Sequence, residues 1–275
     1  MYTVRLPGGQ FRNPDRMYKK LINKVVSRTR RLRSARRLRS LIEIHEPALT
    51  RLGTSYGGWT LPISKVRSGS TALCVGAGED ISFDVELNKR GITVVTIDPT
   101  PRAKEHVARV LASANGGSRA SINNSPVEFY DMQGFDEDRF KFLDVGLWNQ
   151  NTSMRFFAPR DQNYVSHSIV NLQYTEQYFE AKCMTLRSVC DLLKLDTIDI
   201  LKLDIEGAEH AVLKNVVEDG PRPSVLCVEF DEVGNPLDGG YMERILDTTQ
   251  MLKKAGYKFR HFDSSIPNAL FLQYN

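Results

Sequence analysis

The sequence predicts an α/β fold with a doubly wound, mostly parallel sheet of seven strands, one of them antiparallel. Short apolar runs alternate with amphipathic helical stretches from residue 71 to residue 256, which is typical of a sheet covered by helices on both faces. The last two expected strands, 257–262 and 269–273, are joined by only residues 263–268. This link is too short for a helical crossover, so these two strands should be antiparallel.

Turn residues separate the expected elements, with Gly91 and Gly256 ending two of the helices. The expected helices are 13–40, 81–89, 102–113, 184–195, 206–217 and 241–255. The other expected strands are 71–75, 92–97, 127–130, 140–147, 198–203 and 225–230, with a hairpin strand at 152–158. Residues 159–180 carry no regular pattern, and 53–59 are a glycine-rich loop.

Charge divides the chain into two parts. Residues 1–40 hold 13 Lys and Arg and one acid, whereas the other 235 residues hold 24 Lys and Arg and 32 acids. We therefore expect a basic, helical N-terminal extension over residues 1–52 and a mildly acidic domain over 53–275. A loose apolar stripe along the basic helix would pack it on the body or hold it on an anionic membrane or a polyanion; its members are Met17, Leu21, Val25, Leu32, Leu38 and Leu41.

The cysteine pattern favours a reducing compartment. The four cysteines form no C-x-x-C pair, and Cys74 and Cys227 lie in expected strands, so neither a disulfide framework nor a zinc site is favoured. No apolar run approaches the roughly 18 residues of a membrane span, and no signal-like segment opens the chain. We expect a cytoplasmic protein, with peripheral membrane contact through residues 1–40 as an additional hypothesis.

A glycine turn follows the first strand of the main domain and predicts a cofactor site. Gly76, Ala77 and Gly78 stand between this strand and a helix, where the backbone can approach a ligand closely. Asp98 ends the second strand, where a carboxylate can accept hydrogen bonds from both hydroxyls of a ribose. Sites for NAD and for S-adenosylmethionine share these features.

The residues after the turn separate these two cofactors. Glu79 and Asp80 stand where the pyrophosphate of NAD would lie, and a third glycine is missing. Two acids repel a diphosphate but suit the sulfonium and amino groups of S-adenosylmethionine, so the charge pattern favours S-adenosylmethionine. The alternative is that both acids only stabilise the N-terminus of the following helix.

The run Ile200-Leu-Lys-Leu-Asp-Ile-Glu-Gly-Ala-Glu209, followed by His-Ala-Val-Leu213, resembles the K-x-D-x-E-G-A-E signature of the FkbM family of methyltransferases. Supporting features are residues 73–78, Asp98, Thr185-Leu186 and Val228-Glu229. The resemblance covers about residues 53–275, excludes the basic arm, and departs from the family at Glu79-Asp80. It implies a Rossmann-like class I methyltransferase fold with S-adenosylmethionine as donor, S-adenosylhomocysteine as product, and a hydroxyl of a saccharide, glycolipid or polyketide-type molecule as acceptor.

Three residues are the candidate catalytic groups. Asp204 ends the fourth strand beside the glycine turn in a 3-2-1-4-5 strand order, so it should lie near the methyl group. A hydroxyl acceptor must lose its proton as the new bond forms. Asp204, Glu206 in the first helical turn, and His167 in a loop over the site are candidates for this role. His210 is a further candidate, but we expect it on the flank of the helix.

Further residues are expected to line the cofactor and the acceptor. Gly146 and Leu147 follow the third strand, where adenine usually rests. Tyr56 and Trp59 flank a glycine pair and could stack on a sugar, although a core position for the Trp is the alternative. Glu229, at the end of the fifth strand, is expected to contact the acceptor. Mg²⁺ held by Asp204 and Glu229 is a further alternative that we do not favour, and no metal ligand is assigned.

Three other functions compete with this interpretation. A nucleic-acid 2′-O-methyltransferase would bind its substrate through the basic arm and would use Asp204 and Glu229 as part of a catalytic Lys-Asp-Lys-Glu set. The acidic body argues against it, because a channel for RNA should be basic. A non-catalytic scaffold is disfavoured because Gly76, Gly78 and the strand-end acids are intact. An NAD-dependent oxidoreductase is disfavoured by the acids that follow the turn.

Overall fold

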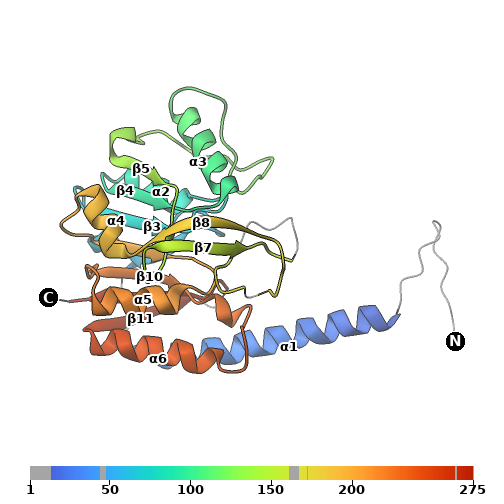
Figure 1. Ribbon diagram of the computed structural model, residues 1–275. Helices are drawn as coiled ribbons and strands as arrows, with labels where there is room; N and C mark the ends of the chain where they lie inside the picture. The colour runs from blue at the N-terminus through green and yellow to red at the C-terminus, as the bar shows by residue number, and fades with distance from the viewer. Residues whose placement is uncertain (1–13, 44–47, 161–166, 172, 264, 275) are drawn as a thin grey trace, which may run out of the picture.

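The computed structural model describes residues 14–43, 48–160, 167–171, 173–263 and 265–274, with side chains from residue 25 onward. Its centre is a seven-stranded sheet in the order β11-β12-β10-β9-β3-β4-β5 (Figure 1). These strands are β3 (Thr71–Val75), β4 (Thr93–Ile97), β5 (Phe140–Leu143), β9 (Ile200–Leu203), β10 (Val225–Glu229), β11 (Tyr257–Asp263) and β12 (Asn268–Gln273). β12 pairs antiparallel with β10 and β11, and the remaining pairs are parallel. The predicted sheet is confirmed.

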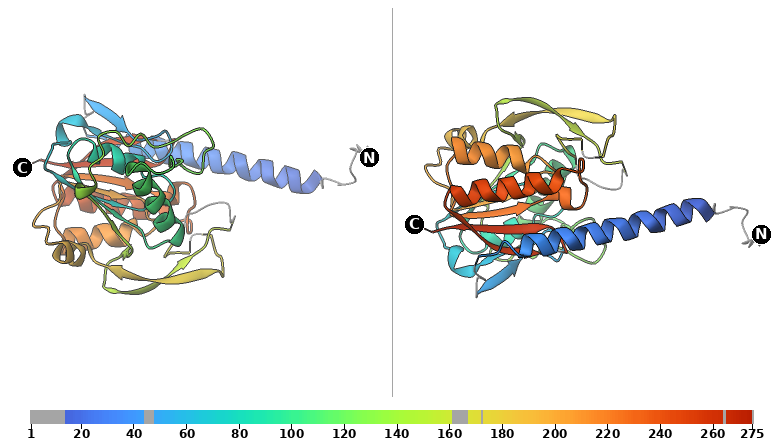
Figure 2. Two further views of the ribbon diagram at one scale, coloured as in Figure 1. Left: turned by 90° about the horizontal axis from the view of Figure 1, so that it is seen from above. Right: turned by 90° about the horizontal axis from the view of Figure 1, so that it is seen from below.

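Helices cover both faces of the sheet, as Figure 2 shows from two sides. One face carries α1 (Pro14–Arg39), α4 (Leu186–Leu193), α5 (Glu209–Glu218) and α6 (Tyr241–Lys254), and the other carries α2 (Ser82–Asn88), α3 (Pro101–Ala114) and the hairpin of β1 (Leu49–Leu52) and β2 (Trp59–Pro62). Side chains alternate along each strand. In β3, Leu73 and Val75 join the first core, and Ala72 and Cys74 join the second.

A second, three-stranded sheet lies between β5 and α4 in the sequence. Its order is β6 (Gly146–Leu147), β8 (Tyr178–Met184) and β7 (Thr152–Phe157). β7 and β8 form the expected hairpin, but the sequence predicts no strand over β8, whose pairing partner β7 lies about 25 residues earlier across a long connection. The predicted strand 140–147 is two strands in different sheets.

The strand expected at 127–130 is wrong. Of these residues, Phe129 forms an isolated bridge with Ser121, and the next element along the chain is the 3₁₀ helix η2 (Glu137–Arg139). Val127 is 80% exposed, so its apolar side chain does not pack on a neighbouring strand. A β-branched residue predicts a strand only when such a half-buried surface is present.

The N-terminal helix extends away from the body. Figure 1 shows α1 projecting from the molecule, with only its C-terminal part against the domain. Ser34, Ala35 and Leu38 are buried there, whereas Val25 and Leu32 are 57% and 62% exposed. The expected helix is confirmed, but the apolar stripe does not pack on the body along its whole length. The side chains of Met17 and Leu21 lie outside the described residues.

The hairpin after α1 belongs to the body. Leu52 in β1 and Trp59 and Leu61 in β2 are buried in the core beside α2. We therefore propose that the division between the basic extension and the domain lies before β1, and not after residue 52. The 3₁₀ helices η1 (Ile63–Lys65) and η3 (Asp231–Val233) complete the described elements. None of the described helices is both long and apolar enough to cross a membrane.

The turn after β3 requires glycine at residue 76. Its φ of +85° lies in the left-handed region, and a Cβ atom there would overlap the carbonyl oxygen of Asp204. The carboxyl ends of two neighbouring strands meet at this contact, since Gly76 follows β3 and Asp204 follows β9. The backbones of the turn and of the strand end can approach each other only because the side chain is absent.

We predict that Gly76→Ala lowers the free energy of unfolding by about 3 kcal/mol or more, because backbone strain and overlap add. Gly116→Ala is the matched control: its φ is +80° but no atom lies within 4 Å of the added Cβ, so only strain of about 1 kcal/mol remains. Urea denaturation of both variants measures the difference. Equal losses would contradict the predicted overlap.

Candidate active site

Asp98 organises the glycine turn. Its Oδ2 accepts hydrogen bonds from the backbone N–H groups of Ala77 at 2.8 Å and Gly78 at 3.1 Å. Its Oδ1 accepts from the N–H and hydroxyl of Thr100, at 2.7 and 2.6 Å. Thr100 in turn caps α3. A carboxylate has about four acceptor positions, so protein donors already occupy those of Asp98. A ribose hydroxyl would have to share or displace one of them.

The two acids after the turn also have protein partners. Glu79 is paired with Arg102 at 3.0 Å and accepts a hydrogen bond from Asn124 at 2.6 Å. Asp80 accepts from the Thr54 hydroxyl at 2.6 Å and from the N–H of Gly57 at 3.1 Å, and its other oxygen accepts from the N–H of Ser82 at the start of α2. Asp80 thus stabilises the N-terminus of α2, the alternative role that the sequence left open.

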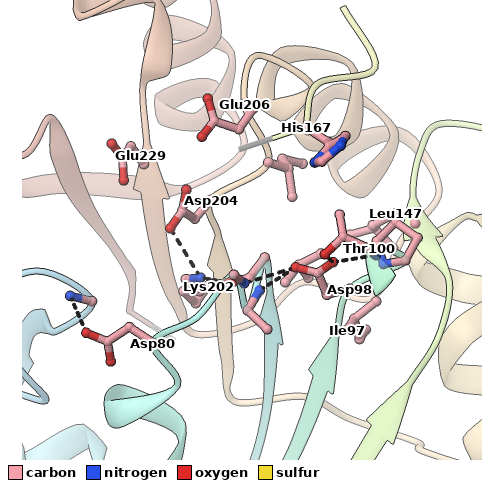
Figure 3. Close-up of a pocket in the computed structure, with 18 of the residues that line it drawn as sticks. Asp80, Ile97, Asp98, Thr100, Leu147, His167, Lys202, Asp204, Glu206 and Glu229 are labelled. Atoms are coloured by element: carbon pink, nitrogen blue, oxygen red, sulfur yellow. Dashed lines mark hydrogen bonds and ion pairs between the residues drawn. The ribbon is translucent and has the colours of Figure 1, made fainter. Parts of the chain in front are cut away.

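A cavity opens above the glycine turn, at the carboxyl ends of the parallel strands. It brings together nearly all the residues expected from the sequence: Tyr56, Gly76, Ala77, Gly78, Glu79, Asp80, Asp98, Gly146, Leu147, His167, Asp204, Glu206 and Glu229. In Figure 3, Asp204, Glu206 and Glu229 lie on one side of the cavity, and Asp98, Thr100 and Leu147 on the other. Ligands of doubly wound sheets bind at this edge of the sheet.

Lys202 is a buried cation below the cavity that the sequence analysis did not single out. Its side chain is 5% exposed, its Nζ donates to the carbonyl of Gly76, and it lies 3.4 Å from Oδ2 of Asp204. Attraction to Asp204 and Asp84 outweighs burial and raises the pKa of Lys202. In the sequence, the alternation of Lys202 and Asp204 places both residues on one face of the strand. It does not show that the two side chains form an ion pair.

Carboxylates from two neighbouring strands approach one another on the Asp204 side. Burial, together with repulsion from Asp204 and Glu206, raises the pKa of Glu229 well above its ordinary value. Burial and repulsion from Glu206 and Glu229 do the same for Asp231 in η3. Glu206 does not lie in a helical turn as expected: it has φ +53° and precedes α5. Both shifts favour the neutral, protonated forms of Glu229 and Asp231, which lessens the repulsion among these closely placed carboxyl groups.

His167 and His210 take the places that were expected of them. His167 lines the cavity and lies edge-on to Phe179 of β8, with ring centroids 5.2 Å apart. Nδ1 of His210 is 2.8 Å from the Thr248 hydroxyl, and its ring stacks on Phe230 on the flank of α5. His210 is not among the residues that line the cavity.

The structure corrects the expectation for Trp59. This side chain is 2% exposed and packs against Phe83 in the core, so an acceptor cannot stack on it. Strand β2 turns it inward, which places it as a core anchor. Tyr56 differs: it is 58% exposed and lines the cavity. Partial burial and the carboxylates of Asp204 and Glu206 raise the pKa of Tyr56 to about 12.

The inserted sheet and the loop beside it contribute two of the apolar lining side chains that lie outside the predicted set. Phe156 of β7 and Ile169, which follows the bridge between Phe157 and Ser168, line it together with Leu147. Phe156 lies in the expected hairpin strand, whereas Ile169 comes from the stretch 159–180, which carries no regular pattern in the sequence. Among the described residues, no group of three or more His, Cys, Asp and Glu side chains has an arrangement that could hold a metal ion.

A family model described as "Methyltransferase FkbM domain" matches residues 74–259. The chain belongs to the FkbM methyltransferase family. S-adenosylmethionine is therefore its methyl donor. The match spans the sheet from β3 to β11, including the glycine turn and the Asp204 strand end, and leaves out α1 and the β1–β2 hairpin.

Solved structures are similar to this FkbM-family chain at low identity. Cofactor-bound Rv0187 from MTB is 14% identical, over 96% of this chain and 98% of that one, with a TM-score of 0.41. An O-methyltransferase from Bacillus cereus in complex with SAH is 10% identical, over 76% of each chain, with a TM-score of 0.39. Fibrillarin from Aeropyrum pernix with bound S-adenosyl-L-methionine is 9% identical, over 75% and 67%, with a TM-score of 0.37. No curated protein matches the chain.

The buried carboxyl of Asp84 in α2 predicts a pH dependence of stability. Burial raises its pKa to about 6, against the attraction of Lys202 and a hydrogen bond from Thr96, whereas an unfolded Asp titrates near about 3.9. The folded state therefore holds this proton more tightly. Its contribution to stability is full below about pH 4 and is lost as the pH rises through about 6.

We predict that Asp84→Asn removes a fall in the free energy of unfolding between pH 4 and pH 7, of order 3 kcal/mol in the parent chain. Urea denaturation at several pH values measures it. Asp138→Asn, at an exposed carboxylate of η2, should leave the pH profile unchanged. A parent-like profile in Asp84→Asn would show that Asp84 does not carry this dependence.

Proposed function

We propose that the protein transfers a methyl group from S-adenosylmethionine to a hydroxyl of a saccharide, glycolipid or polyketide-type acceptor. The observation that supports this most is the position of Asp204. Its carboxylate faces the cavity beside the glycine turn and is held by Lys202. A carboxylate fixed in this place can orient a hydroxyl and receive its proton.

The side chains around the cavity fit S-adenosylmethionine. Ile97, Pro99 and Leu147 offer an apolar surface suited to adenine, and the acids near Asp204 suit a cationic methionine end. Lys202 is the one Lys or Arg among the lining residues described, and it is already paired, so a diphosphate does not fit. When bound, S-adenosylmethionine supplies an electrophilic methyl group attached to sulfur.

Residues that line the cavity would orient the acceptor and receive its proton. We propose that Asp204 accepts a hydrogen bond from the acceptor hydroxyl and takes its proton as the new C–O bond forms and the C–S bond breaks, the electron pair remaining on sulfur. Glu206 and His167 line the same cavity and are the alternative proton acceptors. Phe156 and Ile169 exclude water from that side, which favours displacement by the acceptor.

The acids on one side of the cavity also argue against the main alternative function, methylation of a nucleic acid. A nucleic-acid substrate would bring phosphates close to Asp204, Glu206 and Glu229, where repulsion opposes binding. A 2′-O-methyltransferase would need a basic path into the cavity. We therefore prefer a non-nucleic-acid acceptor.

We also propose that α1 contacts an anionic membrane, while the domain lies in the cytoplasm. The last residues of the antiparallel β12 lie on the side of the sheet opposite that from which α1 projects (Figure 1), so α1 extends beyond the edge where the parallel strands end and the cavity opens. Val25 and Leu32 share one exposed side of the helix, with Arg28 and Arg36 exposed nearby. Such a helix could hold the cavity near lipid-linked acceptors. The four free, buried cysteines suit a reducing compartment.

We expect S-adenosylhomocysteine to bind the intact chain with micromolar affinity, measured by calorimetric titration, and NAD not to bind. Asp98→Ala should abolish S-adenosylhomocysteine binding because the N–H groups of Ala77 and Gly78 lose their acceptor. Asp144→Ala, at an exposed carboxylate after β5, is the control. Preferential binding of NAD would overturn the proposed function.

We expect the intact chain to float with vesicles containing about 30% anionic lipid, and this binding to weaken as salt is raised. Replacing the exposed Arg28, Arg33 and Arg36 by Ala should reduce it strongly, at about 1 kcal/mol for each charge. The control replaces three exposed lysines of the body, Lys141, Lys182 and Lys214. Equal losses in both triple variants would argue against a specific role of α1.

A further inference from the structure

The loop between β9 and α5 carries three of the residues that line the cavity, namely Asp204, Ile205 and Glu206. Asp204 and Glu206 lie on the same side of the cavity (Figure 3). The N–H of Ala208 donates to the carbonyl of Ile205 at 3.3 Å, which closes a tight turn. Both central residues of this turn, Glu206 and Gly207, have positive φ values of +53° and +94°. This conformation is unfavourable for a residue other than glycine, so other contacts must hold the turn.

Glu209, the first residue of α5, supplies these contacts. Its Oε1 accepts hydrogen bonds from the backbone N–H groups of Ile205 at 3.0 Å and Gly207 at 3.2 Å, on either side of Glu206. Glu209 itself is buried and is not among the residues that line the cavity. Its carboxylate therefore acts on the cavity through the backbone of the turn.

The backbone at the start of this loop also contacts the glycine turn after β3. The N–H of Asp204 donates to the carbonyl of Val75 at 3.1 Å, and the carbonyl oxygen of Asp204 occupies the space that a Cβ of Gly76 would need. Farther along the loop, the hydroxyl of Ser168 donates to the carbonyl of Glu206. A shift of the loop would thus move Asp204 together with the turn expected to bind the cofactor.

The carboxylate of Glu209 also forms a hydrogen bond with the carboxyl group of Asp231 in η3. The two residues are 1% and 7% exposed, and two buried carboxyl groups in contact do not both ionise. Burial and repulsion from Glu206 and Glu229 raise the pKa of Asp231 well above its ordinary value. Its Oδ2 has no hydrogen-bond partner among the residues with described side chains. Asp231 therefore carries the proton, and Glu209, which accepts from two N–H groups, is the ionised partner.

We propose that Glu209 is a positioning residue, which holds Asp204 and the turn after it through a proton that it shares with Asp231. Asp204 is the proton acceptor under the proposed function, on which this role of Glu209 rests. The shared proton connects the segment after β9 to the segment after β10, so these two neighbouring strand ends keep one arrangement around the cavity. Loss of the proton would leave two adjacent buried carboxylates, and their repulsion would displace the turn.

Charged groups on the neighbouring elements do not take the place of this proton. Those groups are Lys202, Asp204 and Glu206 on β9 and its loop, Glu229 and Glu232 on β10 and η3, His210 on α5, Arg244 on α6 and Arg30 on α1. The acids Asp204, Glu206 and Glu229 repel Asp231. The basic side chains have other partners: Lys202 pairs with Asp204, His210 and Arg244 lie against Glu232, and Arg30 donates to the carbonyl of Gly234. The pair is therefore held together by its own proton.

Affinity for S-adenosylhomocysteine, measured by calorimetric titration from about pH 6 to about pH 9, tests this role, because strongly raised buried carboxyl groups titrate in this range. The parent chain should bind best while the pair holds its proton and should lose about tenfold in affinity as the pH rises through the pKa of the pair. Asp231→Asn puts an amide donor in place of the titrating carboxyl, so this loss should disappear. The amino group of S-adenosylhomocysteine also titrates, but it does so equally in both proteins.

Asp138→Asn is the matched control, because Asp138 also stands in a 3₁₀ helix but is exposed, and it should keep the parent's loss of affinity. If Asp231→Asn does not fold, Glu209→Gln replaces it, since the amide keeps an acceptor for the two N–H groups and adds a donor for Asp231. Glu209→Ala keeps neither and should weaken binding about tenfold at about pH 6, a loss that Glu209→Gln should largely recover.

A parent affinity that does not fall with pH, a fall that persists in Asp231→Asn, or equal weakening by Glu209→Gln and Glu209→Ala would each overturn this role of Glu209. These outcomes leave the proposed function standing, because the parent still binds S-adenosylhomocysteine at about pH 6. No binding by the parent at any pH would overturn the proposed function and the role of Glu209 together.

Discussion

A single buried ammonium connects the parts of this active site. Lys202 stands in the central strand β9, donates to the carbonyl of Gly76, and pairs with Asp204. A buried charge is tolerated only when its partners are in place, since removing one costs several kcal/mol. The glycine turn and the carboxylate of Asp204, which both line the cavity, are therefore held by the same cation. Gly76 must lack a side chain for this arrangement to close.

Acidic residues follow the carboxyl ends of β9 and β10, where they contribute little to the stability of the fold. Glu206 adopts a left-handed φ of +53°, and Glu229 and Asp231 repel their neighbours. Strain and like charges of this kind persist at sites where function requires them. The rigid sheet below supplies the stability that the site lacks, through cores on both of its faces.

The basic helix α1 contacts the body at η3, the short segment that follows β10 and the cavity residue Glu229. Arg30 donates to the carbonyl of Gly234 at 2.7 Å, and Ser34 is 2.9 Å from the hydroxyl of Tyr241. Gly234 ends η3, which begins two residues after Glu229. The docked end of α1 thus packs against the segment that carries Asp231 and follows the end of β10.

The sequence by itself determined the alternating sheet, the antiparallel last strand and the signature that placed Asp204, because period and glycine spacing are local properties. Nearly all the site residues that it indicated line the cavity. Only the tertiary structure decided that β8 pairs with β7, that Trp59 is buried, and that Lys202 contacts Gly76 across 126 residues. Such contacts depend on which elements become neighbours, and no local pattern encodes the partner of a buried side chain.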